Sequence, residues 1–237
     1  YNTEGVEMIN ISDKTTLLAV QGPKAIAALQ PLTKENLTDI PFYQFRINEF
    51  AGVADVVISN TGYTGSGGFE IYVHKDHAEK VWDAIMESGK AVGIEPTGLG
   101  CRDTLRLEMG YCLYGNDITD TTSPLEAGLG WITKLKKESD FINKEYFINQ
   151  KEEGVKRKLV AFEMLERAIP RNGYEICDAD ENVIGFVTSG TQSPSMGKAI
   201  AMGYVNLPHN AVDTEIYVKV RNKYAKGKVV KLPFFKA

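Results

Sequence analysis

The chain has 237 residues, enough for one large domain or two small ones, and for a sizeable core without a metal or disulfide. Hydrophobic residues make up 43% and charged residues 24%, as in ordinary globular proteins, which excludes bulk disorder. The net charge of −4 argues against a nucleic-acid partner. No apolar run approaches the roughly 18 residues of a membrane span. We therefore expect a protein that binds a small ligand or another protein.

Cysteine usage gives no sign of a metal or redox site. Cys101, Cys112 and Cys177 are odd in number and widely spaced, and no C-x-x-C pair is present. We expect no metal site and three buried thiols in a reducing compartment, the cytoplasm.

The first part of the chain alternates strand and helix patterns. We predict strands over 15–20, 42–47, 52–59 and 69–73, and helices over 23–29, 75–88 and 99–109. In the amphipathic helix over 75–88, the apolar residues at helical spacing are Ala78, Val81, Trp82 and Ile85, and we expect Gly89 at the C-terminal cap. The order of these elements predicts an α+β fold built on a split βαβ, ferredoxin-like unit.

The last third contains short strands rich in β-branched and aromatic residues. They are predicted over 158–162, 183–188, 200–205, 215–220 and 228–232. Turn residues separate them, which is typical of a small antiparallel β-barrel or sandwich. The polar stretch 134–157 predicts an exposed helix or linker. We therefore expect an α+β region over 1–150, truncated at its N-terminus, and a C-terminal β-barrel domain over 151–237.

Common catalytic and nucleotide-binding motifs are missing. The glycine-rich segment 62–68 lacks the Lys-Ser/Thr ending of a P-loop, and Asp103 stands where a dinucleotide fingerprint needs its third glycine. The three histidines, His74, His77 and His209, do not support a Ser-His-Asp or Cys-His arrangement. Chemistry at this protein would depend on carboxylates, arginines and aromatics.

Three places could form a small-molecule site, and each keeps a structural alternative. The glycines of 61–70 permit close backbone approach by a ligand, or form a plain hairpin turn with Glu70 on its solvent face. Arg102 and Arg106 bind a ligand, or pair with carboxylates of the same surface helix, Asp103 and Glu108. Trp131 is a ligand platform or a core residue.

Several strings of the chain are distinctive when they are taken together and in order. They are Leu18-Ala-Val-Gln-Gly-Pro23, Gly62-Tyr-Thr-Gly65, Gly68-Phe-Glu70, Gly98-Leu-Gly-Cys-Arg-Asp-Thr-Leu-Arg-Leu-Glu108, Leu113-Tyr-Gly-Asn-Asp-Ile118, Glu126-Ala-Gly-Leu-Gly-Trp131, Val187-Thr-Ser-Gly-Thr191, Ser193-Pro194 and Pro233-Phe234. This ordered set, which extends across nearly the whole chain, resembles the T-protein of the glycine cleavage system, the tetrahydrofolate-dependent aminomethyltransferase.

The resemblance implies that Glu70 and Arg102 contact tetrahydrofolate, the co-substrate. A carboxylate suits the pterin ring, because the ring presents an amino group and an N–H side by side. Arg102 would supply a fixed fork of donors to a folate oxygen or carboxylate. Tyr63, Tyr114 and Trp131 are weaker candidates for the walls of the ring pocket.

The reaction that the resemblance implies is a one-carbon transfer. An aminomethyl group arrives on the lipoyl arm of a carrier, the H-protein, and tetrahydrofolate takes its methylene as ammonia leaves. The family's catalytic aspartate lies upstream of the matching strings, so no catalytic residue is assigned here. We expect the chain to be the C-terminal two thirds of such an enzyme and inactive alone.

Two other functions remain open at this stage. The same folate module occurs in demethylating oxidases, which add a flavin domain. It also occurs in non-catalytic folate-binding proteins that act in RNA modification or iron–sulfur assembly. The non-catalytic relatives tend to lose the Gly-Leu-Gly-x-Arg-Asp and Leu-Tyr-Gly-x-Asp strings, and both strings are present here.

Overall fold

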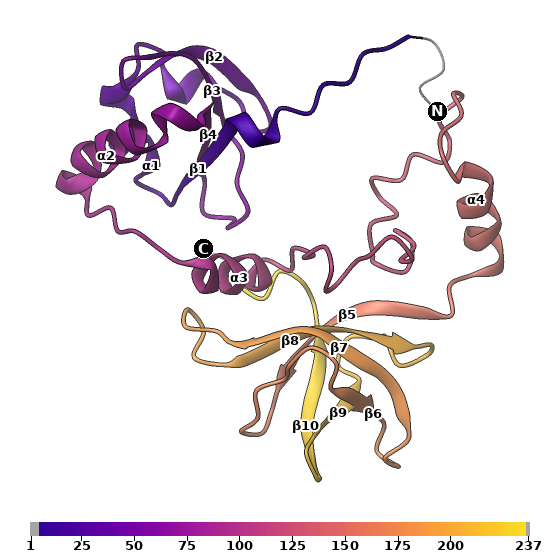
Figure 1. Cartoon of the computed structure of the whole chain (residues 1–237). Coiled ribbons are helices and arrows are strands. Elements are labelled where there is room, and N and C mark those ends of the chain that lie inside the picture. The colour runs from indigo at the N-terminus through magenta and orange to yellow at the C-terminus, as the bar shows by residue number, and fades with distance from the viewer. Residues whose placement is uncertain (1–4, 236–237) are drawn as a thin grey trace. The chain divides into compact units, whose positions relative to one another are not determined.

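The computed structural model describes residues 5–235, and the chain divides into two units, Tyr1–Arg102 and Asp103–Ala237. Figure 1 shows the sheet-and-helix unit and the barrel. The helix α3 (Leu99–Glu108) begins in the first unit and ends in the second.

A four-stranded antiparallel sheet forms the centre of the first unit, in the order β1-β4-β3-β2. Its strands are β1 (Thr15–Gln21), β2 (Phe45–Phe50), β3 (Val53–Ser59) and β4 (Gly68–His74), and its helices are α1 (Ala25–Leu29) and α2 (Ala78–Gly89). β1 and β3 are both antiparallel to β4, so they run parallel to each other with β4 between them. This is the split βαβ arrangement that the element order predicts.

Strand β4 separates two environments by simple alternation. Phe69, Ile71 and Val73 are buried in one core with residues of α1 and α2. Because successive strand residues point to opposite faces, Glu70 and Tyr72 project from the other face of the sheet. The sheet therefore turns the Glu70 carboxylate away from the helices.

Two local predictions for this unit were wrong. Strand β2 begins at Phe45 rather than at residue 42, and Tyr43 has a positive φ of 66° that interrupts an extended chain. Gly89 is the last residue of α2, while Gly93, with φ 77°, ends the following turn. Trp82 is 44% exposed, because the buried line of the helix runs through Val81 and Ile85.

The second unit contains a closed barrel with strand order β10-β5-β8-β7-β6-β9, which confirms the predicted barrel. Its strands are β5 (Arg157–Met164), β6 (Glu175–Cys177), β7 (Val183–Gln192), β8 (Ala199–Asn206), β9 (Glu215–Val220) and β10 (Lys223–Val230). The prediction missed β6, which has only three residues. It also placed the last strand at 228–232, because lysines alternate with the buried Ala225 and Val229 along β10 and hide its apolar face.

The polar stretch before the barrel forms α4 (Lys144–Glu153), which has no buried residue, as expected of an exposed helix. The expectation of three buried thiols was wrong, since Cys177 is buried but Cys101 and Cys112 are partly exposed. Within residues 5–235, no helix is long and apolar enough to cross a membrane. The same residues contain no group of three or more His, Cys, Asp or Glu side chains that could hold a metal ion.

Candidate functional site

The loop between β3 and β4 packs tightly against the end of β1. A Cβ at Gly62 would lie 1.9 Å from Oε1 of Gln21, and one at Gly68 would lie 2.3 Å from the carbonyl oxygen of Val20. Gly68 also has a φ of 127°, which side-chain-bearing residues rarely adopt. Gly68 is therefore required by the backbone of the loop, whereas a side chain at Gly62 would have to displace the Gln21 amide.

The side-chain amide of Gln21 holds both ends of this loop. Its Nε2 donates to the carbonyl oxygens of Thr61 (3.2 Å) and Phe69 (3.3 Å). Its Oε1 accepts a hydrogen bond from the Thr64 hydroxyl at 3.1 Å. The Gln21 amide thus holds Thr61 and Phe69, which lie on either side of Glu70 in space. These two residues are 40 and 48 positions away from Gln21 in the sequence.

The Glu70 carboxylate is half-buried and held by two hydroxyl groups. Oε2 accepts hydrogen bonds from the Thr61 hydroxyl and from the Tyr72 hydroxyl, the latter at 3.5 Å. Burial raises the pKa of Tyr72, and the charge of Glu70 and the hydrogen bond to it raise it further. Glu70 is therefore a partly enclosed, oriented acceptor, which differs from a side chain on the open face of a hairpin.

Arg102 lies over an aromatic ring of the same loop. Its guanidinium carbon is 4.4 Å from the centroid of the Tyr63 ring. Tyr63 is half-buried and Arg102 is exposed. This is a cation–π distance, and a guanidinium in such a contact keeps N–H donors for other partners. The structure thus brings Glu70, Tyr63 and Arg102 into one unit and places two of them in contact.

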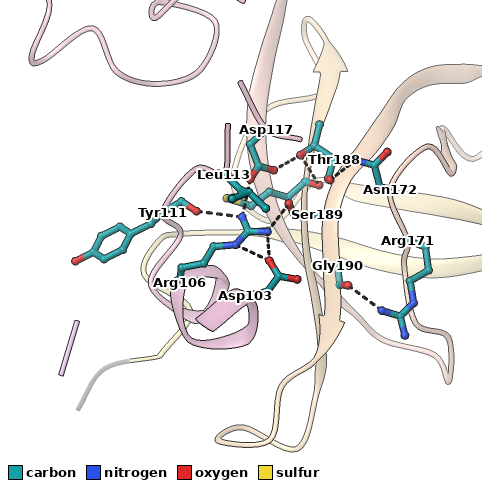
Figure 2. Close-up of polar contacts among 11 residues, drawn as sticks. Asp103, Arg106, Tyr111, Leu113, Asp117, Arg171, Asn172, Thr188, Ser189 and Gly190 are labelled. Carbon is teal, nitrogen blue, oxygen red and sulfur yellow. Dashed lines mark hydrogen bonds and ion pairs between the residues drawn. The ribbon is translucent and has the colours of Figure 1, made fainter. Parts of the chain in front are cut away.

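Arg106, one turn further along α3, has a different environment (Figure 2). Its side chain is 1% exposed. Nε and Nη2 donate to Asp103 Oδ1 at 2.8 and 2.5 Å, Nη1 donates to Asp117 Oδ2 at 2.6 Å, and Nη2 donates to the Ser189 hydroxyl at 2.8 Å. The expected pairing with Asp103 is present, but the arginine lies in the interior of the second unit rather than on a surface.

The carboxylates of Asp117 and Glu108 have structural partners within this unit. Asp117 is buried, and it accepts from the Thr188 hydroxyl and from the backbone N–H of Leu113 at 2.8 Å. Glu108 does not pair with an arginine as expected. It accepts from the hydroxyls of Ser193 (2.5 Å) and Ser195 (2.8 Å). These contacts tie α3 and the segment after it to the barrel.

Two of the predicted aromatic residues lie in the second unit. Tyr114 is 67% exposed and Trp131 is 74% exposed, so the core alternative for Trp131 was wrong. Trp131 borders a cavity of about 480 Å³ that is also lined by Lys151 and Lys158.

Sequence reasoning missed three side chains around Glu70: Gln21, Thr61 and Tyr72. The alternation of β4 placed Tyr72 on the same face as Glu70, and this was the one available signal. Gln21 stands in the Leu-Ala-Val-Gln-Gly-Pro string, but its reach to the loop depends on the pairing of β1 with β4.

The fold is that of a mixed α/β protein, in which a split βαβ sheet backed by helices is followed by a closed antiparallel barrel. Its candidate site is a glycine-rich loop beside the Glu70 carboxylate of β4. The family model described as "GCVT N-terminal domain" matches residues 1–137, and "Glycine cleavage T-protein C-terminal barrel domain" matches residues 157–236. The chain belongs to the glycine cleavage T-protein family.

Curated relatives with the name aminomethyltransferase are similar over the whole chain. The Flavobacterium psychrophilum protein is 61% identical over 236 residues, and the Bacteroides fragilis protein is 58% identical over 236 residues. In both cases the alignment covers 100% of this chain and 65% of the relative. A crystal structure of the glycine cleavage system aminomethyltransferase T from Bartonella henselae matches with a TM-score of 0.84 and 34% identity, covering 93% of this chain and 60% of that one.

Proposed function

We propose that this chain binds tetrahydrofolate and acts in aminomethyl transfer, as part of a glycine cleavage aminomethyltransferase. The observation that carries the proposal is the half-buried Glu70 carboxylate at the end of the β3–β4 loop, together with Arg102 of α3, which lies 4.4 Å from the ring centroid of Tyr63 in that loop. An oriented carboxylate, an aromatic ring and a guanidinium are the groups that a folate requires: an acceptor for its pterin N–H groups, a flat apolar wall and a donor.

In this proposal Glu70 accepts two hydrogen bonds from the pterin, and Arg102 donates to a folate oxygen or carboxylate. Tyr63 forms a wall of the ring pocket, and Tyr114 and Trp131 are further candidates for its walls. The region over 1–150 carries this site, and the region over 151–237 is the barrel domain.

The reaction is the transfer of the methylene of a lipoyl-bound aminomethyl group to tetrahydrofolate, with release of ammonia. The lipoyl-bearing partner is the H-protein. Tetrahydrofolate supplies the nucleophilic nitrogen, and the protein orients it. We assign no catalytic role to Asp117 or Glu108, since both are buried among structural partners. The chain matches 65% of the length of its relatives, and the remaining part of those proteins is where the catalytic aspartate is expected.

The binding proposal is tested by calorimetry with tetrahydrofolate on this chain and on Glu70→Gln. Each charge-assisted hydrogen bond contributes roughly 1.5–3 kcal/mol, so the substitution should weaken binding about tenfold or more. Glu79→Gln is the matched control, because it removes the same charge from an exposed position of α2. Equal affinity of all three proteins would remove Glu70 from the site.

The turnover proposal is tested by an aminomethyl-transfer assay with H-protein. The 237-residue chain and a full-length relative are compared at equal concentration. We expect turnover by the relative and none by this chain. Turnover by this chain at a comparable rate would place the catalytic group within its residues.

A further inference from the structure

The Thr61 hydroxyl and the Glu70 carboxylate come together because of the register of the β3–β4 hairpin. Ser59 is paired with Glu70, and Thr61 lies two residues beyond Ser59 as the chain leaves the strand. The Thr61 hydroxyl bonds to Glu70 Oε2 and lies 3.0 Å from the Ser59 hydroxyl, which is 9% exposed. The threonine therefore sits between a buried serine and the carboxylate.

The hydrogen bonds to Glu70 fall on one of its two oxygens. Thr61 and Tyr72 both contact Oε2, and Oε1 accepts none from the residues that the structure describes. A carboxylate fixed through one oxygen has a defined plane, and its second oxygen remains available to a donor from outside the protein. In a two-point contact with a planar ligand, Oε1 would accept one N–H, and Oε2 would accept the other in place of its 3.5 Å bond from Tyr72.

Thr61 is itself held through its backbone. The Gln21 amide donates to the carbonyl oxygen of Thr61 and also to that of Phe69, the residue before Glu70. The donor and the acceptor of the Thr61–Glu70 bond are thus attached to backbone positions that one side chain holds together. The missing side chain of Gly62 makes room for that amide.

We propose that Thr61 is a positioning residue, which fixes the Glu70 carboxylate for a planar heterocycle with adjacent N–H donors, and that Gln21 holds Thr61 in place. The inference rests on the proposed function and extends it from the residue that touches the ligand to the residues that orient it. Loss of the Thr61 hydroxyl leaves only the 3.5 Å bond from Tyr72 to hold the carboxylate, and ordering the carboxylate on binding then costs affinity.

The test uses two substitutions of Thr61 that separate its hydroxyl from its shape. Thr61→Val keeps the shape and removes the donor, whereas Thr61→Ser keeps the donor and removes a methyl group. With tetrahydrofolate as the probe in calorimetry, we expect Thr61→Val to raise Kd about tenfold and Thr61→Ser to leave it within about twofold. A packing role for the side chain predicts the reverse order.

A double-substitution cycle links the effect to Glu70. In a Glu70→Gln background, Thr61→Val should cause little further loss, because the two residues act as a unit. Gln21→Glu, which keeps the side-chain size and replaces the amide donor, should also weaken binding in the unsubstituted chain and add little in the Glu70→Gln background. If urea unfolding shows that Thr61→Val does not fold, Gln21→Glu replaces it in the cycle with Glu70→Gln.

The outcomes separate this inference from the proposed function. Absence of tetrahydrofolate binding by the unsubstituted chain would overturn both. Binding by the unsubstituted chain that Glu70→Gln weakens and Thr61→Val does not would overturn the positioning role alone. Full additivity of Thr61→Val with Glu70→Gln would do the same.

Discussion

Arg102 and Arg106 carry the same functional group on one helix and have opposite environments. Arg102 is exposed and lies over the Tyr63 ring, with N–H donors available to a ligand. Arg106 is 1% exposed, and its donors are used by two carboxylates and a serine. A guanidinium committed to buried partners is a structural element, so ligand binding by α3 is expected at its first turn.

The pKa of the Cys112 thiol depends on its burial and on the nearby charges of Asp117 and Arg106. Burial raises its pKa to about 11, with the Asp117 charge acting in the same direction and Arg106 opposing it. In the folded protein the thiol should stay protonated between pH 9 and about 11, where the unfolded chain releases its proton. The folded state then binds more protons, so its stability should fall as pH rises through this window.

Alkylation measures this directly. In a Cys101→Ser/Cys177→Ser variant, the rate of Cys112 modification by iodoacetamide should keep rising until about pH 11. In denaturant the same rate should level off at a lower pH. Identical pH profiles in the two conditions would contradict the raised pKa.

At the scale of elements, the ion pairs and the hydrogen bond of Arg106 tie three segments together. The arginine belongs to α3, Asp117 to the segment after it, and Ser189 to β7. Removing one partner of a buried pair leaves the other charge unsatisfied, which typically costs about 3–5 kcal/mol.

We therefore expect Arg106→Met to lower the free energy of unfolding by about 3–5 kcal/mol in urea denaturation. Lys90→Met is the control, because the Lys90–Glu87 pair is exposed and should contribute less than about 1 kcal/mol. Similar losses in the two variants would show that the interior pair contributes no more than a surface pair.

The sequence predicts elements well where alternation is strong and long, as in β4 and the buried strands of the barrel. It fails for β6, which is only three residues long, and for β10, where lysines interrupt the apolar face. It also could not place Arg106 in the interior, because Asp117 and Ser189 are 11 and 83 residues away.

Only part of the candidate site could be predicted from the sequence. Glu70 and Arg102 were proposed from the resemblance to a family. The bond from Thr61 to Glu70 and the reach of Gln21 depend on strand register, which the residue pattern does not specify. The orienting groups therefore emerge only in three dimensions, although each lies in or beside a string that the sequence singles out.

At the scale of the whole molecule, the two units bury separate cores. One is centred on residues such as Phe69 and the other on the barrel interior, which includes Phe162. Truncating a buried phenylalanine to alanine typically costs 3–5 kcal/mol in the core that contains it.

Hydrogen exchange resolved by segment should detect this separation. Phe162→Ala is expected to accelerate amide exchange in β5, β8 and β10 and to leave β1 to β4 unchanged, while Phe69→Ala should do the reverse. Equal acceleration in both units after either substitution would mean that they open as one cooperative body.

The regular geometry of α3 fixes the angle between its side chains around the helix axis. Each residue of an α-helix advances about 100° around the axis, so the four-residue spacing of Arg102 and Arg106 sets the angle between an exposed guanidinium and an interior one. A single inserted alanine between them would keep every side chain and the helix itself. It would nevertheless rotate the two arginine positions by about 100° relative to each other around the axis of α3. The length of this short stretch is therefore as much a part of the protein's chemistry as the identity of its residues.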